Sequence, residues 1–174
     1  LLFGEARMGR AVDTQQCVQL VDDIADSVGR NPGALISLAR LKTKDNYTYM
    51  HSVAVCGLMV SLARQLGLDE VQVREAGFAG LLHDIGKVVT PNAILDKPGR
   101  LDPAEMAIMR GHVTAGGEIL SQNGDWPADI VHAVLHHHER LDGTGYPNGL
   151  NGESLPPLGR ILAACDAYAA MCCA

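Results

Sequence analysis

The sequence predicts an all-helical bundle built as one domain. Apolar residues recur at three- and four-residue spacing along most of the 174 residues, and no convincing alternating strand pattern appears. Apolar residues make up 47% of the chain, which is enough for a single hydrophobic core. We therefore expect an N-terminal connecting helix within residues 1–33, followed by the main domain over residues 34–174.

Four helices are predicted in the first half of the chain. The first carries an apolar stripe that serves either the core or a dimer-forming signalling helix, and it consists of Val18, Val21, Ile24, Ala25 and Val28. Asn31-Pro32-Gly33 ends this helix, since proline and glycine break the helical pattern. A short helix over residues 34–41 follows, then a longer one over 47–66 and a fourth over 69–83.

The second half contains three more predicted helices and one long loop. Asp102-Pro103-Ala104-Glu105 begins a helix that reaches about residue 121, because it combines a capping acceptor, an early proline and a glutamate. Another helix follows Pro127 and runs to about His138, and the last begins near Leu158. Residues 142–157 are rich in glycine, proline and asparagine, and such a long irregular loop is usually functional.

Composition excludes several classes of function. Fourteen lysines and arginines against twenty acids give a net charge of −6 without a basic cluster, which argues against binding long nucleic acids. No apolar run approaches the roughly twenty residues that span a bilayer, and no signal peptide is recognisable, so we expect a cytoplasmic protein. The five cysteines lack CxxC spacing and are expected to be reduced and mostly buried.

The strongest functional signal is the run His136-His137-His138-Glu139, together with the upstream pair His83-Asp84. Histidines gathered beside acids indicate a metal site, because imidazole and carboxylate both bind divalent ions. His51, His112 and Asp166 lie on other predicted helices and are expected to converge with them. Side chains of adjacent residues on a helix point about 100° apart. Asp84 could therefore bind the same ion as His83 only if its carboxylate turned inward, where it could also bridge to a second ion.

These motifs resemble those of HD-GYP domains, the bacterial branch of the HD phosphohydrolases. The family is named for the pairs that stand here as His83-Asp84 and Gly145-Tyr146-Pro147. The resemblance covers roughly residues 47–171 and includes the whole stretch from His83 to Lys87. It implies an HD-type helical bundle.

The resemblance implies a cyclic di-GMP phosphodiesterase. Such an enzyme hydrolyses cyclic di-GMP to the linear dinucleotide, and often on to GMP, with a metal-bridging hydroxide as nucleophile. Two divalent ions are implied, iron or manganese in most members, and the ligand types also suit zinc. One ion would be held by His51, His83, Asp84 and Asp166, and the other by His112, His137 and His138, with Asp84 bridging both.

The resemblance also assigns supporting residues. Lys87 would stabilise charge on the phosphoryl oxygens or protonate the leaving group. Asp142, Gly145 and Tyr146 would shape the substrate pocket with Lys87, and Tyr146 could stack on a base. Glu139 is expected to orient a ligand histidine, and His136 to play a supporting or solvent role. The Gly145-Tyr146-Pro147 loop would dock diguanylate cyclases that carry GGDEF domains, and a homodimer is compatible with the leading helix.

Two departures from the family pattern leave alternatives open. Tyr47 stands where a third metal would need a glutamate, so we expect a dinuclear centre. Ala169 replaces the second aspartate of the family's Asp-x-x-Asp pattern, and the Arg-Pro-Tyr segment does not appear before Ala174, which suggests an incomplete C-terminal part. The alternative is therefore a catalytically weak domain that senses cyclic di-GMP or docks proteins. Another HD nucleotide phosphohydrolase is disfavoured by the Gly145-Tyr146-Pro147 loop.

Overall fold

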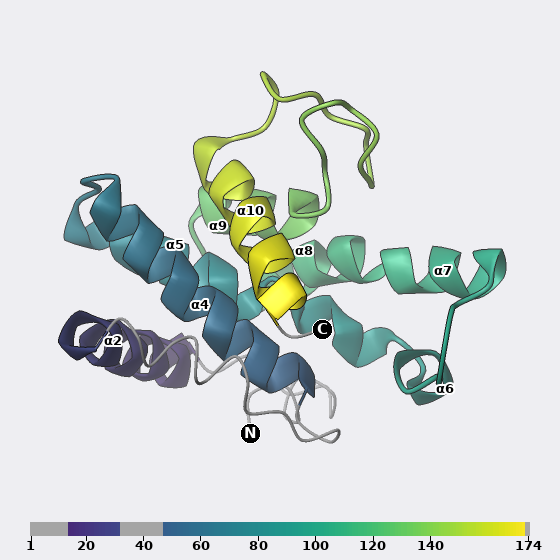
Figure 1. Cartoon of the computed structure of the whole chain (residues 1–174), viewed down its shortest axis with the longest axis horizontal. Helices are drawn as coiled ribbons and strands as arrows, with labels where there is room; N and C mark the ends of the chain where they lie inside the picture. The colour runs from purple at the N-terminus through teal and green to yellow at the C-terminus, as the bar shows by residue number, and fades with distance from the viewer. Residues whose placement is uncertain (1–13, 32–46, 173–174) are drawn as a thin grey trace.

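The computed structural model describes residues 14–31 and 47–172 as a bundle of helices (Figure 1). Two long helices, α4 (Tyr47–Gln65) and α5 (Glu70–Leu82), pack against each other in the bundle. The leading helix α2 (Thr14–Arg30) packs on both of them. The stripe residues Val21, Ile24 and Val28 are buried, and Val18 and Ala25 are partly buried against the same core, so this stripe belongs to the core.

The later helices close the bundle on the other side of α4 and α5. α8 (His112–Gln122) packs against α9 (Ala128–His136), which also contacts α5. α10 (Pro157–Cys172) lies across α4 and α9. Among the described residues the regular elements are all helices, apart from the single bridge between Asp142 and Asn151, which confirms the all-helical prediction.

A short arm projects from the bundle to the right in Figure 1. It consists of α6 (Asn92–Leu95) and α7 (Pro103–Arg110), and no residue of α7 is buried. The predicted start of α7 is confirmed, because Asp102 accepts hydrogen bonds from the backbone amides of Ala104 and Glu105. Residues 34–41, where a short helix is predicted, lie outside the described part of the chain.

The single helix predicted over residues 102–121 is wrong, because Gly111 divides it into α7 and α8. The amide of Gly111 donates to the carbonyl of Ile108, one residue nearer than in an α-helix, and this tighter turn ends α7. The apolar spacing continues through the break, so periodicity alone could not reveal it. The break places His112 at the first position of a new helix.

The burial of the cysteines and the end of α9 agree only partly with the sequence predictions. Cys17, Cys56 and Cys165 are buried and form no disulfide, as predicted, whereas Cys172 is exposed and Cys173 lies outside the described residues. α9 ends at His136, two residues before the expected position, so His137 and His138 follow the helix. Within the described ranges, no helix has both the length and the apolarity that a membrane crossing requires.

Gly86 brings the 3-10 helix η2 (Ile85–Val89) into close contact with α8. A Cβ atom at this position would overlap the carbonyl oxygen of His112 and lie 2.5 Å from the amide nitrogen of Gly116. Both obstacles are backbone atoms, which cannot move aside as the end of a flexible side chain can. The glycine therefore allows the segment after His83-Asp84 to approach the segment that begins with His112.

We expect Gly86→Ala to lower the free energy of unfolding of the metal-free protein by about 3 kcal/mol, as overpacked sites do. Urea denaturation followed by circular dichroism measures this change. Gly29→Ala is the matched control, because a Cβ atom there meets only the Arg64 guanidinium at 3.4 Å, and α2 should become slightly more stable. Equal small effects in both variants would contradict the close approach at Gly86.

Candidate metal centre

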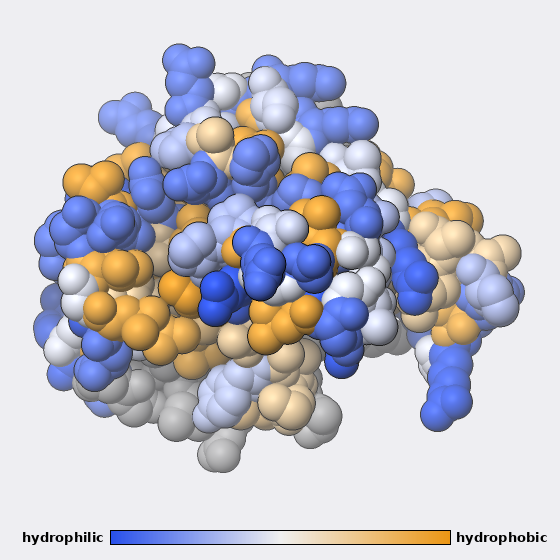
Figure 2. All heavy atoms as spheres, turned by 90° about the horizontal axis from the view of Figure 1, so that it is seen from above, coloured by the Kyte–Doolittle hydropathy of each residue, from blue (hydrophilic) through white to orange (hydrophobic). Residues whose placement is uncertain are grey.

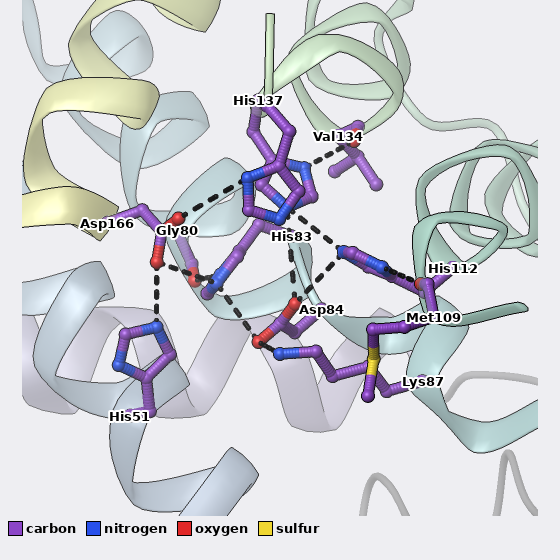
Figure 3. A network of polar contacts seen from close by, with 11 residues as sticks. His51, Gly80, His83, Asp84, Lys87, Met109, His112, Val134, His137 and Asp166 are labelled. Carbon is purple, nitrogen blue, oxygen red and sulfur yellow. Dashed lines mark hydrogen bonds and ion pairs between the residues drawn. The ribbon is translucent and has the colours of Figure 1, made fainter. Parts of the chain in front are cut away.

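The predicted ligands come together in the interior of the bundle (Figure 3). Two groups each bring three donor atoms within 4.8 Å of one another: His51, His83 and Asp84 in the first, and His112, His137 and His138 in the second. Four helices supply them, since His51 lies on α4, His83 and Asp84 follow α5, His112 begins α8, and the remaining pair follows α9. Asp166, on α10, forms a third such group with His83 and His137.

Three of these histidines are held in the same way. The Nδ1 atoms of His83, His112 and His137 lie 2.7–2.8 Å from the backbone carbonyl oxygens of Gly80, Met109 and Val134, each three residues earlier. A carbonyl only accepts, so each Nδ1 carries a proton that it donates. The opposite ring nitrogen, Nε2, then has a lone pair directed into the site, as metal coordination requires.

Helix ends explain this shared geometry. The last turn of a helix leaves carbonyl groups without amide partners inside the helix. His83 and His137 are the C-cap residues of α5 and α9, and His112 follows the C-cap of α7. In each case a ring N–H binds a carbonyl of the last turn, so the end of the helix fixes both the tautomer and the direction of the ligand nitrogen.

Asp84 belongs to the first group, also approaches the second, and is 1% exposed. Its Oδ2 atom is 3.3 Å from His83 Nε2, whereas its Oδ1 atom is 3.4 Å from His112 Nε2 and 4.0 Å from His137 Nε2. One carboxylate thus presents one oxygen to each group, as a bridging ligand would. Burial alone would raise the pKa of Asp84, but the charges of His83 and Lys87 outweigh it and hold the pKa well below the usual range.

Asp166 completes the side of the site that faces α4. Its Oδ1 atom lies 2.8 Å from His51 Nε2 and 3.7 Å from His83 Nε2. Burial opposes ionisation, but the hydrogen bond from His51 and the charge of His83 lower the pKa of Asp166 to about 2. Two ionised carboxylates therefore stand in an interior that is otherwise lined by imidazoles.

The second group is built from neutral histidines. Burial is the first cause that lowers the pKa of His112, of His137 and of His138, the last to about 4. His83 behaves differently, because burial is outweighed by the negative charges of Asp84 and Asp166, which raise its pKa. Near neutral pH the second group therefore offers unprotonated nitrogens, while the carboxylates attract positive charge toward His83.

The donor set fits divalent cations. His83 Nε2 and Asp84 Oδ1 are buried side-chain atoms that make no hydrogen bond in the described part of the chain. In addition, the Nε2 atoms of His112 and His137 face each other at 3.3 Å, although each ring has its proton on Nδ1. Facing lone pairs repel unless a cation lies near both, and buried polar atoms without partners are costly. Nitrogen and carboxylate donors without cysteine suit iron, manganese or zinc.

Lys87 stands at the edge of this centre. Its Nζ atom donates to Asp84 Oδ2 at 2.6 Å, and its side chain is 23% exposed. The 3-10 turn that follows Asp84 brings the two side chains together, because residues three apart lie on one side of such a helix. The ammonium group is therefore held beside the first ligand group while it remains accessible from solvent.

Glu139 does not orient a ligand histidine, so that prediction is wrong. Its buried carboxylate accepts hydrogen bonds from the backbone amides of Asn148 at 2.6 Å and Leu150 at 3.0 Å. His136 contacts the same segment, with Nε2 3.2 Å from the side-chain amide of Asn148. Both residues thus attach the loop after α9 to the end of that helix, and the Nδ1 contacts of the ligand histidines go to backbone carbonyls instead.

We expect Glu139→Gln to loosen the loop but leave the metal content unchanged. An amide offers only one oxygen acceptor, so one of the two backbone amides loses its partner. Hydrogen exchange measured by mass spectrometry should then rise over residues 142–151. Glu118→Gln, an exposed change on α8, serves as control. Metal loss without faster exchange in the loop would instead restore the ligand-orienting role.

The predicted pocket residues occupy different surroundings in this loop. Tyr146 is half-buried, and its ring lies 4.8 Å from that of His138. Gly145 packs on the backbone after His138, since a Cβ atom would overlap Glu139 and Arg140. Asp142 is 57% exposed and uses its carboxylate within its own turn, where it accepts from the amide and hydroxyl of Thr144. Contact between Asp142 and a substrate stays a prediction.

Both departures from the family pattern can be located. Ala169 is fully buried in the core cluster on α10, one turn after Asp166, so its methyl group contributes packing where the family has a carboxylate. Tyr47 is the first residue of α4, and its side chain lies outside what the structure describes. The number of ions therefore stays a prediction.

Sequence reasoning missed one polar residue near the centre. Arg110, the last residue of α7, places its Cζ atom 5.0 Å from the centroid of the Tyr146 ring. Arginine is not a metal ligand, so Arg110 is part of no ligand motif. The only indication of its role in the sequence was its position two residues before His112. The folded loop, rather than the local sequence, brings it to the site.

Comparison with known proteins gives one matching family model, described as an HD domain, over residues 25–174. The chain is 55% identical to the cyclic di-GMP phosphodiesterase PA4108 of Pseudomonas aeruginosa over 170 residues, which cover 98% of this chain and 41% of that protein. It is 43% identical to a cyclic di-GMP phosphodiesterase of Thermotoga maritima over 129 residues, covering 74% of this chain and 35% of that protein. The chain thus spans about two fifths or less of these curated relatives.

A solved structure has a similar fold. Bd1817, an HDG"Y"P protein from Bdellovibrio bacteriovorus, superposes with a TM-score of 0.74 at 22% identity, over 95% of this chain and 54% of that one. At this level of identity the similarity supports the helical architecture. It is consistent with the arrangement of helices around the ligand groups described above.

Proposed function

Because this chain belongs to the HD domain family, within its HD-GYP branch, we propose that it hydrolyses cyclic di-GMP to the linear dinucleotide. The observation that carries the proposal is the placement of Asp84, whose two oxygens face different ligand groups. Such a site suits a phosphodiester, which presents several oxygens to neighbouring positive charges. The relatives named above as cyclic di-GMP phosphodiesterases supply the substrate class.

We infer two divalent ions, iron or manganese. His51, His83, Asp84 and Asp166 would hold one, and His112, His137 and His138 the other, with Asp84 shared. When bound, two such ions supply positive charge for the phosphodiester and make water acidic enough to act as a nucleophile near neutral pH. Two carboxylates leave a net positive charge of two on a pair of divalent ions, which favours an anionic substrate.

The protein's own groups would support hydrolysis in distinct ways. Water first loses a proton to solvent; the oxygen of the resulting hydroxide forms a bond to phosphorus, the opposite P–O bond breaks, and the leaving oxygen takes a proton. Lys87 would stabilise charge on the phosphoryl oxygens or donate that proton, a role supported by its contact with Asp84 and its partial exposure to solvent. The buried walls around His83, His112 and His137 exclude bulk water, which strengthens these charge interactions.

A second candidate function is favoured by Ala169. The family aspartate at this position is replaced by a buried methyl group, so one polar group of the expected site is missing. A domain that retains metals but turns over slowly would act as a cyclic di-GMP sensor or as a docking module. Docking of GGDEF proteins on the Gly145-Tyr146-Pro147 loop, a homodimer and a cytoplasmic location all stay predictions.

One experiment separates these functions. The chain is reconstituted anaerobically with Fe²⁺ or Mn²⁺, its metal content is measured, and it is incubated with cyclic di-GMP. Chromatography then follows the linear dinucleotide and GMP. Product formation with two metals per chain supports the hydrolase, whereas two bound metals and saturable binding of cyclic di-GMP without product support the sensor.

A further inference from the structure

A groove opens beside the second ligand group, between α7, the start of α8 and the Tyr146-Pro147 segment. Its volume is about 550 Å³, within the range of small-molecule sites. One wall is apolar and comes from Pro103, Met106 and Ala107 on α7. Met106 is 39% exposed, and apolar side chains are visible over the projecting arm at the right of Figure 2.

An ordered stack connects this groove to the metal centre. The rings of His138 and Tyr146 lie 4.8 Å apart at an interplanar angle of 31°, and the Arg110 guanidinium lies over the Tyr146 ring at 5.0 Å. A predicted metal ligand, an aromatic ring and a cation therefore follow one another outward from the centre. The backbone amide of Tyr146 donates a hydrogen bond to the carbonyl oxygen of His138 at 3.2 Å, which keeps the loop in this position.

The guanidinium of Arg110 has hydrogen-bond donors that pair with no carboxylate in the described part of the chain. Within residues 14–31 and 47–172, no carboxylate forms an ion pair with its guanidinium. Guanidinium carries five N–H donors in a rigid plane, and stacking on Tyr146 restricts the orientation of that plane. The side chain is exposed and lines the groove, so these donors are accessible to a ligand there.

We propose that this groove receives one guanine of the substrate and that Arg110 donates two hydrogen bonds to its O6 and N7 atoms. This inference rests on the proposed function, because a cyclic dinucleotide with one phosphodiester at the ligand groups must place a base beside them. The apolar wall suits the flat face of a purine better than a phosphate. Arg110 would therefore be a specificity-determining residue.

The chemistry of the bases explains the selectivity. Guanine presents two acceptors on this edge, which match the forked donors of arginine, whereas adenine presents one acceptor and one amino donor. Adenine would leave an arginine donor facing its amino group. A second phosphodiester could also bind a guanidinium, but it would not distinguish between bases. A preference for guanine over adenine therefore distinguishes binding of the base by Arg110 from binding of the second phosphodiester.

The test compares metal-loaded wild type, Arg110→Ala, Arg110→Lys and Arg74→Ala. Arg74 is a matched exposed arginine at the N-terminal end of α5, where it pairs with Asp22. Hydrolysis of cyclic di-GMP gives kcat and KM, and inhibition of that reaction gives the affinity for cyclic di-AMP. We expect Arg110→Ala to raise KM for cyclic di-GMP about tenfold to a hundredfold and to change kcat less than about threefold.

Arg110→Lys should resemble Arg110→Ala, because lysine keeps the charge but loses the fork. The affinity for cyclic di-AMP should change less than about twofold in either variant, and Arg74→Ala should match wild type. An unchanged KM in Arg110→Ala, an equal loss of affinity for both cyclic dinucleotides, or full rescue by lysine would overturn the guanine assignment.

Failure of the proposed function has a different signature. If metal-loaded wild type forms no product from cyclic di-GMP, hydrolysis is excluded, and calorimetric titration of both cyclic dinucleotides tests Arg110 directly. The expected outcome is again a loss of affinity in Arg110→Ala for cyclic di-GMP alone. Equal affinity of wild type and Arg110→Ala for cyclic di-GMP would reject the inference.

Discussion

Asp84→Asn is expected to lower metal affinity at least about a hundredfold and to reduce hydrolysis of cyclic di-GMP about a thousandfold or more. The carboxylate has one oxygen near His83 and the other near His112, so one substitution affects both ligand groups. An amide of the same shape keeps the packing but removes the charge and one acceptor. A loss of about 4 kcal/mol in transition-state stabilisation corresponds to that rate effect.

Elemental analysis after dialysis and a product assay measure the two effects of Asp84→Asn. Asp125→Asn, an exposed change before α9, should retain full metal content and activity. Circular dichroism of the metal-free proteins shows whether the fold survives. If Asp84→Asn retains one metal tightly and loses only the other, Asp84 is a ligand to a single ion and the bridging role fails.

Lys87→Ala is expected to separate catalysis from metal binding. Removal of a preorganised charge beside a reacting oxygen typically costs about a hundredfold to a thousandfold in kcat. The predicted metal ligands remain in place, so metal content should stay within the error of the measurement. Because Lys87 approaches Asp84 from the solvent side, its loss opens the edge of the site without removing a ligand nitrogen.

The control for Lys87→Ala is Lys97→Ala, which removes a lysine that pairs with Glu105 on the arm. Its kcat should remain within about twofold of wild type. Lys87→Arg should recover little activity, because the planar guanidinium cannot take the place of a compact ammonium. An unchanged kcat in Lys87→Ala would exclude the catalytic role, and loss of metal would show that Lys87 mainly fixes Asp84.

Many features of the fold could be predicted from local sequence. The apolar stripe of α2, the capping box before α7 and the irregular loop after α9 all follow from patterns within a few residues, and the structure contains each of them. The break at Gly111 could not be predicted, because the apolar spacing continues across it. Burial of Ala169 likewise depends on neighbouring helices rather than on its own sequence context.

The predicted ligand set was also accessible from the sequence, because the HD-GYP resemblance assigns it, and the structure brings these donor atoms together. The spacing of these residues did not reveal the orientation of each side chain toward the site. The ring N–H groups of His83, His112 and His137 all bind carbonyls at helix ends, a contact that exists only when the helices end where they do. The role of Glu139 was predicted wrongly for the same reason, since its partners lie nine and eleven residues later in a folded loop.

The sequence by itself determined the all-helical architecture, the residues that can bind metal and the HD-GYP resemblance, because residue type and periodicity are local properties. Tertiary structure alone decided that Asp84 faces two ligand groups, that Gly86 allows η2 to approach α8, and that Arg110 lies over Tyr146. These three contacts join segments that lie far apart in the sequence. The distances between these segments depend on how the helices and loops pack in the folded protein. The chemical character of each residue along the sequence does not specify those distances.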